Sequence, residues 1–198
     1  VGIDDYVTFT EKIDAAGCCV PEINKVGWIG NTTNSPNVIN AWHTTGIKTI
    51  QDVMERGLVV GAPGAASTSY IYPAALNQLI GTKFRIVAGY PGGNEMNMSM
   101  ENGETGARGS NPWSTWKATK PDWIAERKIH VIAQVGLTRA PDLPDVPLLI
   151  DLAKSDDDRA VLRLISAPAT IGRPLFGPPE MPAARLATLR KGFDAMVK

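Results

Sequence analysis

The chain has 198 residues, enough for one well-packed core or for two small lobes. Its 20 basic and 20 acidic residues cancel, so a nucleic-acid or anionic-membrane partner is not expected. No stretch approaches the roughly 18 apolar residues that span a bilayer, which argues against direct membrane insertion. Because the chain starts at Val1 without a signal peptide and stops at Lys198 inside a helical pattern, we expect both ends to be truncated.

The first 25 positions show no clear hydrophobic period beyond a possible short helix around residues 4–15. Cys18 and Cys19 are neighbours, which rarely form a relaxed disulfide, and the chain has no other cysteine. Cysteine usage therefore leaves the redox compartment open. The first strands are predicted at residues 27–30 and 38–42.

A short helix follows at residues 49–54, with Thr49 as its predicted N-cap and Gly57 after its end. The β-branched run 58–60 then enters a turn of small residues at 61–69, which leads into a helix. The free N–H groups and the positive dipole end of that helix form a potential binding site for an anion. No Lys follows the glycines as in a phosphate loop, so the turn suits a smaller anion such as a carboxylate.

The next strand is predicted at residues 84–90, followed by a turn at 91–93. Asn94 is expected to cap the helix after it. A third loop of small residues is predicted at 106–111, and a buried parallel strand at 129–135. The methionines of the Asn94 helix are interpreted as core and lobe-contact residues: Met96, Met98 and Met100.

The proline-rich segment 141–147 is predicted to be an extended crossing between two lobes. Ser155 is expected to cap a helix that carries Val161, Leu162 and Ile165, and a final strand is placed near residues 173–176. The last helix begins near Pro182 and is predicted to bury five side chains: Leu186, Leu189, Phe193, Met196 and Val197.

This order of elements predicts an α/β fold, with one parallel sheet flanked by helices as far as about residue 139. In such a sheet the carboxyl ends of the strands converge on a crevice where ligands bind. Three small polar loops in register, at 61–69, 91–94 and 109–111, favour a binding site over three unrelated turns. The candidate ligand-binding residues are Gly61, Ala62, Pro63, Gly64, Ala65, Ala66, Ser67, Thr68, Tyr90, Gly92, Gly93, Asn94, Ser110 and Asn111.

Tyr90 and Trp113 are expected to line this site. Arg108 is the one cation nearby, and it is either a ligand contact or a structural residue of its strand. No catalytic or metal site is predicted, because only His43 and His130 offer imidazoles and no H-E-x-x-H, C-x-x-C or G-x-S-x-G occurs. The dinucleotide pattern G-x-G-x-x-G is also missing, so no cofactor is expected.

The stretches 60–67, 81–93, 100–104, 120–123, 141–147 and 151–154 together resemble the extracytoplasmic solute receptors of tripartite tricarboxylate transporters, the TctC/Bug type. The likeness also includes Arg173-Pro174 and runs from about Trp28 to Lys198. It implies a type II periplasmic-binding-protein fold, with two α/β lobes hinged around a small carboxylate and one lobe incomplete in this chain.

The resemblance implies that residues 1–42 hold an unassigned segment and part of the first lobe. Residues 43–139 would be the second lobe with the ligand loops, and residues 140–198 would return to the first lobe. The family's anion loop corresponds to Gly61 through Thr68, its Tyr-x-Gly-Gly turn to Tyr90, Gly92 and Gly93, and the loop after the third strand to Ser110 and Asn111.

The implied function is that of a periplasmic receptor without enzymatic activity, which captures a small carboxylate and delivers it to the membrane permease subunits of a tripartite transporter. The alternative is a periplasmic receptor that signals ligand occupancy to a partner protein. Many of these receptors have an acidic residue where this chain has Ser110-Asn111-Pro112, which argues against selectivity for ligands with an ammonium group.

Overall fold

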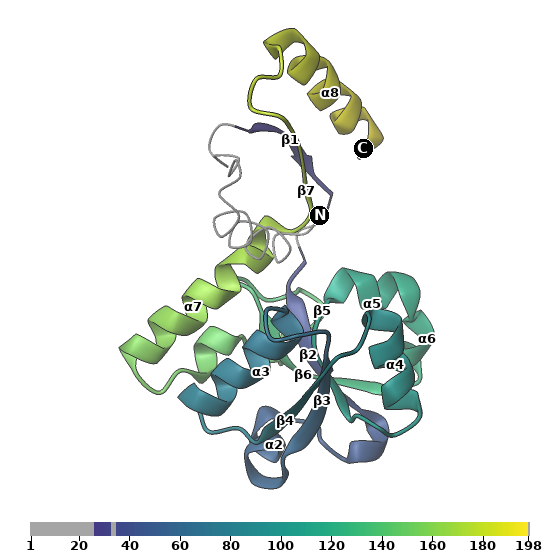
Figure 1. The fold of residues 1–198 in the computed structure, drawn as a ribbon, viewed down its shortest axis with the longest axis vertical. Coiled ribbons are helices and arrows are strands. Elements are labelled where there is room, and N and C mark those ends of the chain that lie inside the picture. The colour runs from purple at the N-terminus through teal and green to yellow at the C-terminus, as the bar shows by residue number, and fades with distance from the viewer. Residues whose placement is uncertain (1–25, 33–34, 198) are drawn as a thin grey trace. The chain divides into compact units, whose positions relative to one another are not determined.

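The computed structural model describes residues 26–32 and 35–197, which form two compact units (Figure 1). The large unit extends from Ser35 to Thr170. The small unit comprises, in its described part, residues 26–32 and the chain from Ile171 onward. The large unit therefore reaches beyond the predicted lobe 43–139 at both ends. The expected helix at 4–15 and both cysteines lie outside the described residues.

The large unit is built around a five-stranded sheet in the order β4-β3-β5-β2-β6. β3 (Leu58–Ala62) is parallel to its two neighbours, β4 (Phe84–Ala88) and β5 (Ala107–Pro112). β2 (Asn37–Trp42) lies between β5 and β6 (Ile129–Val135) and is antiparallel to both. The sheet is therefore mixed, and the prediction of a wholly parallel sheet is wrong because an early strand inserts into it in the opposite direction.

Helices cover both faces of this sheet: α3 and α7 lie on one side, and α4, α5 and α6 on the other (Figure 1). The helical segments are η1 (His43–Thr45), α2 (Ile50–Arg56), α3 (Thr68–Leu79), α4 (Gly93–Glu101), α5 (Trp113–Thr119), α6 (Pro121–Ala125), η2 (Leu149–Leu152) and α7 (Asp156–Ile171).

Two hydrophobic clusters fill the space between the sheet and these helices. The first includes Tyr72 and Leu76 of α3 and Leu162 of α7. The second is rich in tryptophan and includes Trp116 and Trp123. Because the two clusters lie on opposite faces, the strands between them are buried from both sides, as all six residues of β2 show.

Met98 of α4, predicted to be a core or lobe-contact residue, is exposed instead. Met96 and Met100 are four positions apart on the buried face of α4, so Met98, two positions from each, faces solvent at 58% exposure. The predicted helix is present, but the position between the two buried methionines does not belong to its buried face.

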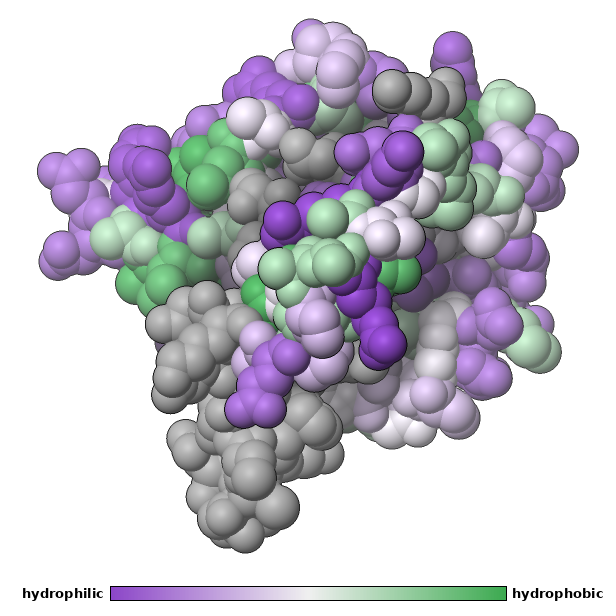
Figure 2. Space-filling view, turned by 90° about the horizontal axis from the view of Figure 1, so that it is seen from above, coloured by the Kyte–Doolittle hydropathy of each residue, from purple (hydrophilic) through white to green (hydrophobic). Residues whose placement is uncertain are grey.

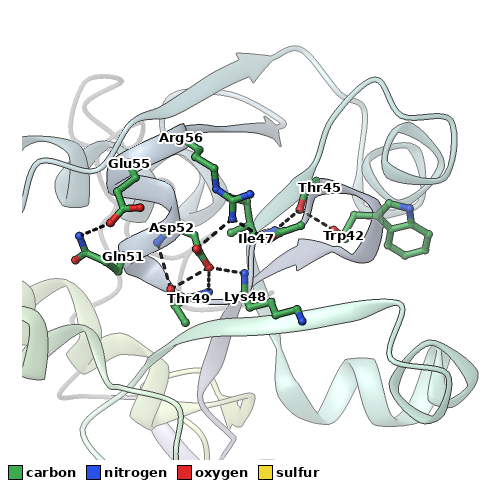
Figure 3. Close-up of polar contacts among 10 residues, drawn as sticks. Trp42, Thr45, Ile47, Lys48, Thr49, Gln51, Asp52, Glu55 and Arg56 are labelled. Atoms are coloured by element: carbon green, nitrogen blue, oxygen red, sulfur yellow. Dashed lines mark hydrogen bonds and ion pairs between the residues drawn. The ribbon is translucent and has the colours of Figure 1, made fainter.

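α2 begins with the predicted cap (Figure 3). Thr49 Oγ1 accepts the N–H of Asp52 at 3.2 Å, and Asp52 Oδ2 accepts the N–H groups of Lys48 and Thr49 at 2.9 Å each. These backbone donors lower the pKa of Asp52 to about 2, because they stabilise the ionised carboxylate. Arg56 pairs with the same carboxylate at 3.1 Å, one helical turn on.

The segment 141–147 lies within the large unit and runs through turns rather than as an extended strand. Gln134 of β6 is fully buried and holds this segment. Its Nε2 donates to the carbonyls of Leu143 and Val146 at 2.8 and 2.9 Å, and its Oε1 accepts the N–H of Ala140 at 2.7 Å. One buried side chain thus supplies the hydrogen bonds that a strand or helix would otherwise provide.

The small unit pairs β1 (Gly27–Asn31) with β7 (Pro174–Gly177) in antiparallel fashion, and α8 (Ala183–Met196) packs against β1. Arg190 Nε donates to the carbonyl of Trp28 at 2.7 Å. None of the five apolar side chains predicted to be buried in the last helix is buried, because the described unit offers only two strands to pack against.

Figure 2 shows hydrophobic residues as separate groups among hydrophilic ones on the face seen from above.

Candidate functional site

β3 and β5 are adjacent parallel strands, with the end of β3 beside the beginning of β5 at Arg108, and the two strands lead to opposite faces of the sheet. β3 leads into α3, whose first turn is pressed against β5: a Cβ at Gly109 would lie 2.2 Å from the carbonyl oxygen of Ser69. β5 leads into α5 on the opposite face, where Trp116 stacks on Arg108. In open α/β sheets, such a switch point is where ligands bind.

The start of α3 is the segment at which the sequence predicts an anion site. Ser67 is its N-cap residue but makes no side-chain cap. Its hydroxyl donates instead to the carbonyl of Gly64 at 2.7 Å, and its N–H donates to the same oxygen at 3.1 Å. The first N–H groups of α3 are therefore left without the usual side-chain acceptor, at the positive end of a 12-residue helix.

Ser110 and Asn111 lie within β5 rather than in a loop, which corrects the third predicted loop. The stretch has the composition of a turn, but its pairing with β2 on one side and β3 on the other extends it. Ser69 Oγ donates to the carbonyl of Ser110 at 3.4 Å. Asn111 is 3% exposed, and its Nδ2 has no partner among the described residues. A buried donor without an acceptor costs about 1–3 kcal/mol, so this amide is suited to a bound acceptor.

The turn after β4 joins the end of β3. The N–H groups of Gly89 and Tyr90 donate to the carbonyl of Ala62 at 3.0 and 3.3 Å. The ring of Tyr90 lies over Gly61, where a Cβ would be 3.0 Å from Cε2. Glycine at position 61 therefore allows the aromatic ring to approach the strand closely.

α4 begins at Gly93 with Gly92 as its N-cap, so the prediction that Asn94 caps this helix is wrong. Asn94 already has helical backbone and is exposed in the first turn. A Cβ at Gly93 would lie 2.7 Å from Nη2 of Arg108, which places the guanidinium directly against the start of α4.

The structure thus brings three groups of predicted residues to one edge of the sheet: the end of β3 with the start of α3, the turn before α4, and the end of β5. The residues of the connecting loop and first turn are exposed or partly exposed: Pro63, Gly64, Ala65, Ala66, Ser67 and Thr68.

Arg108 is a charged group that contacts the start of α4 at this edge. Its Nη1 donates to Asn97 Oδ1 at 3.1 Å, and its Cζ lies 5.4 Å from the centre of the Trp116 ring. Burial lowers the pKa of Arg108 to about 10, which still leaves it protonated at neutral pH. Sequence reasoning missed Asn97, although its position four residues after Gly93 and three before Met100 places a polar group on the buried helix face.

The described residues contain no group of three His, Cys, Asp or Glu that could hold a metal ion. In the same part of the chain, none of the helices is both long and apolar enough to cross a membrane. His130 lies in the outer strand β6, and burial together with the nearby Lys48 lowers its pKa, so it is neutral at physiological pH.

No family model and no curated protein matches the sequence. Solved structures do match. MatC from Rhodopseudomonas palustris with bound malate aligns with a TM-score of 0.57 at 18% identity, over 86% of this chain and 54% of that one. Rpa4515 from R. palustris with adipate aligns with a TM-score of 0.52 at 14% identity, over 86% and 67%.

A TctC solute-binding protein from Polaromonas aligns with a TM-score of 0.53 at 16% identity, over 93% of this chain and 73% of that one. The chain therefore spans from about half to about three quarters of the length of these proteins. At such identities the likeness concerns the fold, and it agrees with the fold that the sequence motifs imply. The chain is folded like the periplasmic solute-binding proteins of the TctC and Bug type.

Proposed function

We propose that this protein is a solute-binding receptor for a small carboxylate, held at the carboxyl edge of β3 and β5. The observation that carries the proposal is the pairing of two sets of donors at that edge. One is the first turn of α3 without a side-chain cap, and the other is the buried amide of Asn111 without a partner. Ser69, which hydrogen-bonds to Ser110, joins the two elements that carry them.

Uncharged donors of this kind suit reversible capture. A hydrogen bond to a charged carboxylate contributes roughly 1.5–3 kcal/mol, so three or four would support micromolar binding. The similar structures with bound malate or adipate contain ligands of this chemical class. For this chain we propose only the same class of ligand, a small carboxylate, and neither malate nor adipate in particular.

The large unit is, on this proposal, one lobe of a two-lobed receptor, and the small unit belongs to the other lobe. We further infer a periplasmic location and delivery of the ligand to membrane permease subunits of a tripartite transporter. Two of the similar proteins are described as a periplasmic transporter and a periplasmic binding protein, which supports the location. The sequence motifs shared with tripartite-transporter receptors support the partner.

Thermal unfolding of the full-length protein with a panel of mono-, di- and tricarboxylates tests the proposal. A ligand at about 100 times its Kd adds about 2.7 kcal/mol to the stability, which raises the midpoint by several degrees. Asn111→Ala should weaken the response at least tenfold in ligand concentration. Thr119→Ala, which removes an exposed hydroxyl of α5, is the matched control and should respond as the wild type does. A protein that responds to no carboxylate would contradict the proposal.

A further inference from the structure

Arg108 is a cation whose charge the described residues leave without a carboxylate. It takes part in none of the ion pairs in this part of the chain. Its Nε is buried without a partner, and Asn97 supplies a neutral acceptor to Nη1 alone. Trp116 stacks against the guanidinium and keeps it in place without neutralising it. A buried charge of this kind is costly to the folded protein unless something else satisfies it.

The register of the sheet places Arg108 beside Gly61, the second-last residue of β3. Gly61 and Arg108 are direct partners across β3 and β5, and in paired parallel strands such positions face the same side. The ring of Tyr90 and the side chain of Met96 lie over Gly61 on that side. Arg108 and Tyr90 are therefore neighbours on the face that α4 covers, and Arg108 retains partial exposure to solvent.

The start of α4 adds to the same positive field. Arg108 lies against Gly93, the first residue of α4, so a guanidinium meets the positive end of a nine-residue helix. These two groups repel each other, and an anion beside both would be attracted by both. Glu95 is the acidic residue of that first turn, but it is exposed and makes no ion pair with Arg108.

We propose that Arg108 binds a second carboxylate of the ligand, so that the receptor selects dicarboxylates over monocarboxylates of the same length. The inference rests on the proposed function, which places the first carboxylate at α3 and Asn111. A guanidinium presents two parallel donors to a carboxylate. This pairing fixes the orientation of the carboxylate and also balances its charge. The specificity of the site then follows from one charged side chain added to a set of neutral donors.

The experiment compares dicarboxylates with their half-esters, which have the same length and one charge fewer. Succinate, glutarate, adipate and their monomethyl esters are titrated calorimetrically into the full-length wild type and into Arg108→Gln. We expect the best diacid to bind the wild type at least tenfold more tightly than its half-ester. Arg108→Gln should lose at least tenfold in affinity for the diacid and less than threefold for the half-ester.

Two further variants complete the design. Arg108→Lys keeps the charge but not the planar fork, and should recover part of the lost diacid affinity even where Arg108→Gln folds poorly. Arg85→Gln removes an exposed cation of β4 and is expected to bind both ligands as the wild type does. Equal affinity of the wild type for diacid and half-ester, or an equal loss of both in Arg108→Gln, would overturn the role of Arg108 and leave the receptor function standing. Failure of the wild type to bind any of the six compounds would overturn both.

Discussion

Gly109 is the position where the attachment of α3 to the sheet can be tested most directly. Gly109→Ala would place a Cβ 2.2 Å from the carbonyl oxygen of Ser69 and 2.8 Å from Cγ of Pro73. Ordinary van der Waals contact begins at 3.4 Å, so the helix must move away from β5 by about 1.2 Å. The obstacle is backbone at the first turn of α3, which cannot rotate aside as a flexible side chain would.

The expected cost follows from this displacement. Overpacking of a well-packed interior typically costs about 1–3 kcal/mol, and movement of backbone places this site at the upper end of that range. Equilibrium unfolding in urea should therefore show a midpoint lowered by about 1 M at unchanged slope. The same movement separates the start of α3 from Asn111, so carboxylate affinity should fall together with stability.

Gly64→Ala is the control for this experiment, because a Cβ at Gly64 meets nothing within 4 Å. It should unfold within about 0.5 kcal/mol of the wild type. If Gly109→Ala also unfolded within that margin, the close packing of α3 on β5 would not exist in solution, and the argument for the site at that edge would fail with it.

Gln134→Met, which removes three buried hydrogen bonds at nearly constant volume, should destabilise the protein by about 2–4 kcal/mol in urea unfolding and expose the segment 141–147 to proteolysis. A stability within 1 kcal/mol of the wild type would contradict this role. The pKa of Asp52 is lowered in the folded state, so its contribution to stability is complete above its ordinary value of 3.8 and is lost as the pH falls toward about 2. Asp52→Ala should therefore melt below the wild type at pH 6, with the difference shrinking between about pH 4 and pH 2; a constant difference would be inconsistent with the cap.

The local signals in the sequence predicted the elements that local chemistry decides. Thr49 and Asp52 form a cap from residues three positions apart, and the structure contains it. The apolar spacing of Tyr72 and Leu76 predicted α3, and both side chains are fully or almost fully buried. The loop before α3 was located by its small residues, because they mark the passage from strand to helix.

The features decided by distant contacts could not be predicted in this way. The stretch Ala107–Pro112 has the composition of a turn, and it is a strand because β2 and β3 flank it. The residues of β2 themselves do not indicate that this strand runs antiparallel to its neighbours. The prolines of 141–147 predicted an extended crossing, but the amide of Gln134, buried in a neighbouring strand, folds the segment back. The pairing of Arg108 with Asn97 likewise depends on how α4 lies on the sheet.

The position of β2 has a consequence for how the molecule comes to be folded. It is the first strand of the large unit in the chain, yet its two partners, β5 and β6, are synthesised long after it. The segment Asn-Val-Ile-Asn-Ala-Trp has no charge, proline or glycine, which is the composition of sequences that stack into cross-β aggregates. Contacts between such distant segments also form slowly. Before Ile129–Val135 has been made, this segment is therefore a place where the chain can aggregate, and we expect a holding chaperone that shields apolar strands to raise the yield of native protein.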